Sequence, residues 1–112
     1  MIVFYVNPSR RISMGETVSP HTLKEKRNEY VIIDVREGEE LNEGTIEGSI
    51  HMPLGMLIKK AKKAMMEELK EKKICTHCSG GYRSNIAADE LNKWGFQAVS
   101  IEGGFKAWKQ IQ

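Results

Sequence analysis

Short apolar runs alternate with longer stretches of helical periodicity along most of the chain. Residues 30–35 form a continuous β-branched run without polar alternation, which is typical of a strand covered on both faces in a parallel sheet. Residues 49–52, 74–77 and 98–101 are three further short runs of strand-like composition. Because strands alternate with helices, the pattern predicts an α/β domain.

An apolar stripe at spacings of three and four predicts a helix between the second and third of these strands. The stripe consists of Leu54, Ile58, Ala61, Met65 and Leu69. Lysines lie between these positions and glutamates follow at once, so we interpret the charged positions as a solvated face and not as an anion-binding patch. This helix is therefore expected to pack its apolar side against the sheet.

A second helix is predicted to begin near Ser84 and to end at Gly95. Ala87, Leu91 and Trp94 recur on one side of it, and a glycine followed by an apolar residue is typical of a left-handed C-cap. We expect Trp94 to be a core residue.

The N-terminal part of the chain has a weaker pattern. Residues 2–6 have the β-branched and aromatic content of an edge strand, while residues 7–19 are turn-like. Ser19 and Pro20 supply an N-cap residue and a proline at the first helical position, which predicts a short helix over residues 22–28.

Composition limits the classes of protein that fit. A chain of 112 residues with 40% hydrophobic and 29% charged residues predicts a single soluble domain over residues 1–112. A net charge of +2 is too small to predict nucleic-acid or membrane binding. No apolar stretch has the length of a signal-peptide core or a membrane span, so we expect a cytoplasmic protein with reduced thiols.

The chemically informative segment follows the third predicted strand. A cysteine there opens a glycine-containing loop that runs into a helix, an arrangement that turns backbone N–H groups toward a small anion. The loop consists of Cys78, Ser79, Gly80, Gly81, Tyr82 and Arg83. A thiol in such a loop should have a lowered pKa and act as a nucleophile, because the thiolate accepts N–H hydrogen bonds beside a helix N-terminus. An isolated cysteine is more often an inert buried residue, but the strand, glycines, arginine and helix together favour the reactive interpretation.

Four segments of the chain are informative together: Asp34-Val35-Arg36-Glu37 after the first strand, residues 44–53, the Cys78 loop, and Gly103-Gly104-Phe105-Lys106-Ala107-Trp108. In this order and spacing they resemble the rhodanese-like domain family. The resemblance covers roughly residues 20–109, whereas residues 1–18 match nothing. Thr45 and Ser49 depart from the family pattern, which usually has His and Ala at these positions.

The resemblance implies a single-domain α/β fold with a central, mainly parallel five-stranded sheet and helices on both faces. It also implies a sulfurtransferase in which Cys78 takes a sulfane sulfur from a donor, becomes a persulfide and passes the sulfur to a thiophilic acceptor. The loop from Cys78 to Arg83 is then the persulfide cradle. The implied partners are a small anionic donor such as thiosulfate and a thiol, cyanide or protein acceptor, with no cofactor.

Several residues near this loop carry two interpretations. We expect Asp34 and Arg36 to fix the chain leaving the first strand through an ion pair, in support of the site. Arg83 either binds a donor anion or caps the loop. His77 is interpreted as a packed or partly exposed residue and Trp108 as a core anchor for the last helix.

Other functions remain open from sequence. A phosphatase of the same fold is one alternative, but six residues from Cys78 to Arg83 are one fewer than the phosphatase members of this fold use. A second alternative is a sulfur-carrier or partner-binding module. Cys75 and Cys78 also invite a thioredoxin-like redox interpretation, but Cys75 belongs to a predicted strand, so we expect it to be a buried packing residue. A zinc site would need two further ligands at suitable spacing, and we expect no metal.

Overall fold

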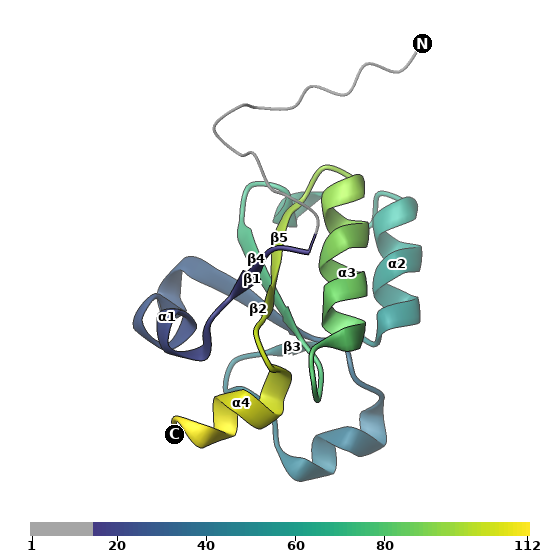
Figure 1. Cartoon of the computed structure of the whole chain (residues 1–112). Helices are drawn as coiled ribbons and strands as arrows, with labels where there is room; N and C mark the ends of the chain where they lie inside the picture. Colours follow the sequence, from purple (N-terminus) through teal and green to yellow (C-terminus); the bar gives the residue numbers. More distant parts are fainter. Residues whose placement is uncertain (1–14) are drawn as a thin grey trace.

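A five-stranded sheet with the order β1-β5-β4-β2-β3 forms the centre of the molecule (Figure 1). This computed structural model describes residues 15–112. The strands are Thr17–Val18 (β1), Tyr30–Asp34 (β2), Ile50–His51 (β3), Lys73–His77 (β4) and Gln97–Ile101 (β5). Every pairing is parallel, which confirms the predicted α/β class and five-stranded parallel sheet.

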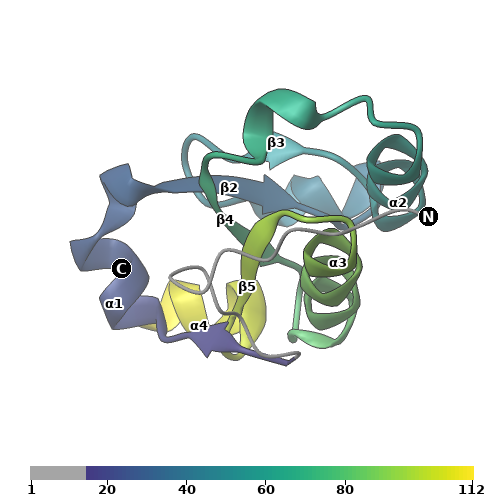
Figure 2. The same cartoon turned by 90° about the horizontal axis from the view of Figure 1, so that it is seen from above.

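Helices cover both faces of the sheet, as Figure 2 shows. The helices are Pro20–Glu25 (α1), Leu54–Lys62 (α2), Tyr82–Lys93 (α3) and Gly104–Gln110 (α4), with 3-10 turns at Arg27–Glu29, Gly38–Glu43 and Glu67–Leu69. On one face Leu57 of α2 and Leu91 of α3 pack against Ile33 and Ile74, and on the other Leu23 of α1 packs with α4. Burial on both faces explains why the central strands are continuous apolar runs.

The predicted helix over residues 54–69 is shorter than expected. Helix α2 ends at Lys62, and Ala64 then has a left-handed φ of 55°. This turn breaks the helical period, so Met65 is 59% exposed while Met66 is 2% exposed and joins the core. The assignment of Met65 to the buried stripe was therefore wrong. Ala61 is buried, and Leu54, Ile58 and Leu69 pack partly buried against the core.

The end of α3 confirms the predicted glycine C-cap. Gly95 has φ 93°, its N–H donates to the Asn92 carbonyl at 3.1 Å, and the Phe96 N–H donates to the Leu91 carbonyl at 3.0 Å. Trp94 is partly buried against the core. The helix begins at Tyr82, two residues before the predicted start.

The first helix has the predicted N-cap, but it spans Pro20–Glu25 instead of residues 22–28, and the strand before it was missed. Ser19 Oγ accepts a hydrogen bond from the Thr22 N–H at 3.1 Å, with Pro20 at the start of α1. Thr17 and Val18, interpreted as part of a turn-like segment, pair with Ser100 and Ile101 as edge strand β1. The predicted strand over residues 2–6 lies outside the described residues.

Candidate active site

Cys78 lies at the carboxyl end of β4, where the chain turns into α3. The residue is 2% exposed, and its sulfur accepts hydrogen bonds from the backbone N–H groups of Gly81 at 3.1 Å and Ser84 at 3.4 Å. The Ser84 hydroxyl lies 3.5 Å from the same sulfur and 2.6 Å from the Ser100 hydroxyl. The predicted loop therefore does direct N–H groups at the thiol.

These contacts control the acidity of the thiol. Burial acts to raise the pKa of Cys78, but hydrogen bonds from Ser84 and from the backbone N–H groups of Gly81 and Arg83 outweigh it and lower the pKa overall. A lowered pKa increases the thiolate fraction near neutral pH. The geometry thus suits a nucleophile.

Two glycines allow this loop to close. Gly81 has φ 112°, a conformation that other L residues rarely adopt. Gly104, at the start of α4 with φ 67°, packs so closely that an added Cβ would collide with the Ser79 backbone. The first turn of α4 also donates hydrogen bonds to the loop, from the Phe105 N–H to the Cys78 carbonyl at 2.7 Å and from the Lys106 N–H to the Ser79 carbonyl at 3.1 Å. Helix α4 therefore packs against the loop and holds its backbone in position.

Arg83 is held by a partner that the sequence did not reveal. Its Nη1 donates to Glu40 Oε1 at 2.6 Å and its Nη2 donates to Glu40 Oε2 at 2.7 Å. Glu40 belongs to the Gly38–Glu43 turn, and its Oε2 also accepts from the Ser79 hydroxyl at 3.3 Å. Figure 1 shows this turn, the Cys78 loop and α4 at the same end of the molecule. Tyr82, which also belongs to the loop, has a side chain that is 79% exposed.

Asp34 and Arg36 form a fully buried ion pair beside the loop. Arg36 Nη2 donates to Asp34 Oδ2 at 2.7 Å and to the Gly44 carbonyl at 2.6 Å. The Thr45 hydroxyl donates to Asp34 Oδ2 at 2.7 Å. Burial acts to raise the pKa of Asp34, but the hydrogen bonds from Arg36 and Thr45 outweigh it and hold the pKa at about 2. The pair fixes the chain after β2, and Thr45 contributes to the same network.

His77 is packed rather than exposed. It is fully buried at the end of β4, with Nε2 3.1 Å from the Ser49 hydroxyl and 3.6 Å from Asp34 Oδ2. Burial lowers its pKa to about 4, so the ring is neutral at neutral pH. His77 therefore has a structural position behind the loop.

Cys75 is buried in the sheet and differs from Cys78 in acidity. It lies in β4 opposite Ile32, is fully buried, and burial raises its pKa to about 12. Both cysteines are free thiols. Within residues 15–112, no three His, Cys, Asp or Glu side chains converge on a point that could hold a metal ion.

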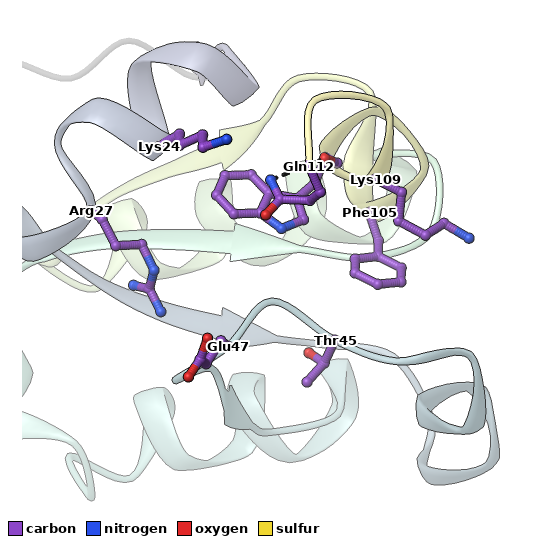
Figure 3. A pocket seen from close by; sticks show the side chains of 8 residues that line it. Lys24, Arg27, Thr45, Glu47, Phe105, Lys109 and Gln112 are labelled. Carbon is purple, nitrogen blue, oxygen red and sulfur yellow. Dashed lines mark hydrogen bonds between the residues drawn. The ribbon is translucent and has the colours of Figure 1, made fainter.

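A separate cavity of about 440 Å³ lies on the α1 and α4 side of the sheet (Figure 3). It is lined by Lys24, Arg27, Thr45, Glu47, Phe105, Trp108, Lys109 and Gln112. None of these residues belongs to the loop from Cys78 to Arg83. The hydrogen bonds to the Cys78 sulfur, and not the residues that line this cavity, therefore define the surroundings of the thiol.

Comparison with known proteins identifies the family. The model of the rhodanese-like domain matches residues 19–111, and the chain belongs to this family. The protein named putative sulfurtransferase YtwF of Bacillus subtilis is 38% identical over 96 residues, which cover 82% of this chain and 88% of that protein. Thiosulfate sulfurtransferase GlpE of Coxiella burnetii is 34% identical over 85 residues, covering 75% of this chain and 76% of that enzyme.

Solved structures agree with this assignment. A rhodanese-related protein from Thermoplasma volcanium has 30% identity and a TM-score of 0.74, covering 86% of this chain and 92% of that one. A protein of unknown function from Rhodopseudomonas palustris, described as a possible tyrosine phosphatase, has 31% identity and a TM-score of 0.74 over 86% of this chain and 80% of that one. In the described part of the chain, no helix combines the length and apolarity needed to cross a membrane. The relatives therefore support a sulfurtransferase-type protein at the level of the family.

Proposed function

We propose that the protein is a sulfurtransferase that carries a sulfane sulfur on Cys78 as a persulfide. The observation that carries this proposal is the Cys78 thiol at the end of β4, with backbone N–H groups directed at its sulfur from Gly81 and Ser84. A hydrogen-bonded thiolate is a good nucleophile toward the donor. It is also a good leaving group when an acceptor takes the outer sulfur of the persulfide.

The reaction has two sulfur transfers. The Cys78 thiolate attacks the outer sulfur of the donor, the new S–S bond forms, and the donor's own S–S or S–sulfonate bond breaks with its electron pair leaving on the donor. With thiosulfate the product that leaves is sulfite, and with an organic persulfide it is a thiolate. A thiol or cyanide then attacks the outer sulfur of the persulfide and releases the Cys78 thiolate.

The residues around Cys78 have separate parts in this proposal. The N–H groups of the loop stabilise negative charge on the cysteine sulfur and on the sulfur bound to it. The donor and the acceptor reach the thiol past a rim formed by Ser79, Gly80 and Tyr82. The Asp34–Arg36 pair positions the segment behind the loop and does not touch the reacting atoms.

Substitution of the nucleophile tests the proposal. Cys78→Ser removes the thiolate but nearly preserves the volume, so sulfur transfer from thiosulfate to cyanide should be lost while the circular dichroism spectrum is unchanged. Steady-state kinetics of the unsubstituted protein should be ping-pong, because the donor product leaves before the acceptor arrives. Retained turnover in the folded serine variant would exclude Cys78 as the nucleophile.

Phosphatase chemistry is the second candidate, because one similar structure carries that description. The loop argues against it, since it has one residue fewer than the phosphatase members of the fold and its arginine is occupied by Glu40. Inserting one glycine after Gly81 should lower sulfur transfer by widening the cradle. Hydrolysis of an aryl phosphate by the unsubstituted protein would favour the phosphatase function instead.

A further inference from the structure

The ion pair between Glu40 and Arg83 places a fixed carboxylate at the rim of the Cys78 loop. Both Arg83 Nη atoms are used by Glu40, at 2.6 and 2.7 Å, and Glu40 Oε2 also accepts from the Ser79 hydroxyl. Both side chains keep about a third of their surface exposed, 33% for Arg83 and 29% for Glu40. The pair is therefore at the surface that a donor must approach.

The position of Glu40 is fixed by more than its arginine partner. Its Oε1 accepts a hydrogen bond from the Glu37 N–H at 3.0 Å, and the two residues form a capping box at the start of the Gly38–Glu43 turn. Hydrogen bonds from Arg83 lower the pKa of Glu40 to about 2, so the carboxylate is charged at neutral pH. Glu40 thus remains in place, with its charge, when the site is empty.

This arrangement changes the charge that a donor meets. Arg83 is the only Lys or Arg between residues 78 and 83, and residues 37–43 contain Glu37, Glu39, Glu40 and Glu43 but no Lys or Arg. A bidentate carboxylate offsets the charge of a guanidinium and occupies one of the donor pairs that would bind an oxyanion. A dianion that approaches the loop must then come close to both this carboxylate and the Cys78 thiolate.

We propose that Glu40 is a specificity-determining residue that disfavours dianionic donors such as thiosulfate and favours organic persulfides or polysulfides. The inference rests on the proposed sulfur transfer and names the donor class of that same site. In the favoured reaction the Cys78 thiolate bonds to the outer sulfur of an organic persulfide. The persulfide's S–S bond breaks, its electron pair leaves on the organic thiolate, and no further oxidant or reductant is required.

Glu40→Gln provides the test, because the amide keeps the shape and an oxygen for Arg83 and Glu37 but loses the charge. The measurement is the rate of single-turnover sulfur transfer to Cys78, followed by mass spectrometry, with thiosulfate and with an alkyl persulfide that carries no other charged group. The ratio of thiosulfate to persulfide efficiency should rise about three- to tenfold, the scale expected for one partly exposed charge acting on a dianion. Glu39→Gln removes an exposed charge from the same turn without touching Arg83, and it should leave the ratio within about twofold.

The dependence of thiosulfate use on ionic strength is a second measurement. A purely structural role of Glu40 would not change it. Added potassium chloride should increase thiosulfate use by the unsubstituted protein, because salt screens like-charge repulsion, and this dependence should be weaker in Glu40→Gln. An unchanged or lowered ratio in folded Glu40→Gln would overturn the inference while leaving sulfur transfer in place. Failure of every donor to load Cys78 in the unsubstituted protein would instead overturn the proposed function, and the inference with it.

Discussion

The acidity of the Cys78 thiol depends mainly on hydrogen bonds from backbone groups and from Ser84. Its sulfur accepts from the N–H groups of Gly81 and Ser84, while the guanidinium of Arg83 is bound to Glu40. Backbone donors are fixed by the fold, so they need no reorganisation when negative charge appears on sulfur. At the scale of residues, the acidity of the proposed nucleophile and the proposed donor selectivity therefore depend mainly on different groups.

Arg83→Ala tests this separation. The variant should lose more activity with thiosulfate than with an alkyl persulfide that carries no other charged group, because it removes the loop's cation and leaves Glu40 unpaired. The comparison of kcat/KM for the two donors is the measurement. An equal loss with both donors would assign Arg83 to holding the loop.

His77 predicts how stability depends on pH. Its pKa falls from 6.5 to about 4 on burial, so the unfolded chain binds this proton more tightly than the folded protein does. The free energy of unfolding is therefore unaffected by this group above pH 6.5. It decreases as the pH falls from 6.5 toward 4, by as much as about 3 kcal/mol. Urea unfolding at a series of pH values should show this slope. His77→Gln should flatten it, and an equally steep slope in that variant would contradict the assignment.

Some of these residues could be predicted from the sequence and others could not. Cys78, Gly81 and Arg83 could be predicted because a nucleophile, a glycine and a cation follow a recognisable strand. Glu40 could not be, because it lies on an irregular 3-10 turn 43 residues from Arg83 and no periodicity links the two. The hydrogen bond from Thr45 to Asp34 shows that this departure from the family pattern still serves the buried ion pair.

At the scale of elements, the start of α4 packs directly against the Cys78 loop. Gly104→Ala should place a Cβ into the Ser79 backbone and strain a φ of 67°, lowering the unfolding free energy by about 2 kcal/mol or more. Sulfur transfer should fall as well, because the displaced loop no longer directs its N–H groups at Cys78. Gly38→Ala is the matched control, since a Cβ added there would meet no heavy atom within 4 Å and the φ of Gly38 is not positive. Equal stability and activity for the two variants would contradict this account of α4.

The placement of Cys75 on β4 predicts that the two cysteines do not act as a redox pair. A strand extends by about 3.3 Å per residue, which holds cysteines three positions apart beyond the reach of a disulfide. Mild peroxide should therefore modify Cys78 alone, and Cys75→Ala should retain sulfur transfer. Non-reducing peptide mapping is the measurement, and a high yield of the Cys75–Cys78 linked peptide from folded protein would contradict the prediction.

Sequence patterns predicted the central elements better than their boundaries. Strands β2, β4 and β5 were recognisable because both faces are buried. The end of α2 could not be predicted, because the left-handed turn lies at Ala64 and no glycine or proline marks it. Strand β1 has two residues, too few for any periodicity.

At the scale of the whole molecule, the sheet order explains where the site lies. The chain runs outward from β2 to edge strand β3 and then crosses back to β4 on the other side of β2. Loops at the carboxyl ends of such neighbouring strands diverge and leave room for a ligand. Cys78 follows β4 and Arg36 follows β2, so the topology brings the proposed nucleophile beside the buried ion pair.

The central claim is that Cys78 carries a persulfide, and mass spectrometry of the intact protein tests it most directly. The protein is incubated with an alkyl persulfide or thiosulfate, separated from excess donor without reductant, and weighed beside the Cys78→Ser variant. The account predicts a gain of one sulfur atom, located on the Cys78 peptide, reversed by cyanide and missing from the serine variant. No gain in mass with either donor, or an equal gain in Cys78→Ser, would contradict it.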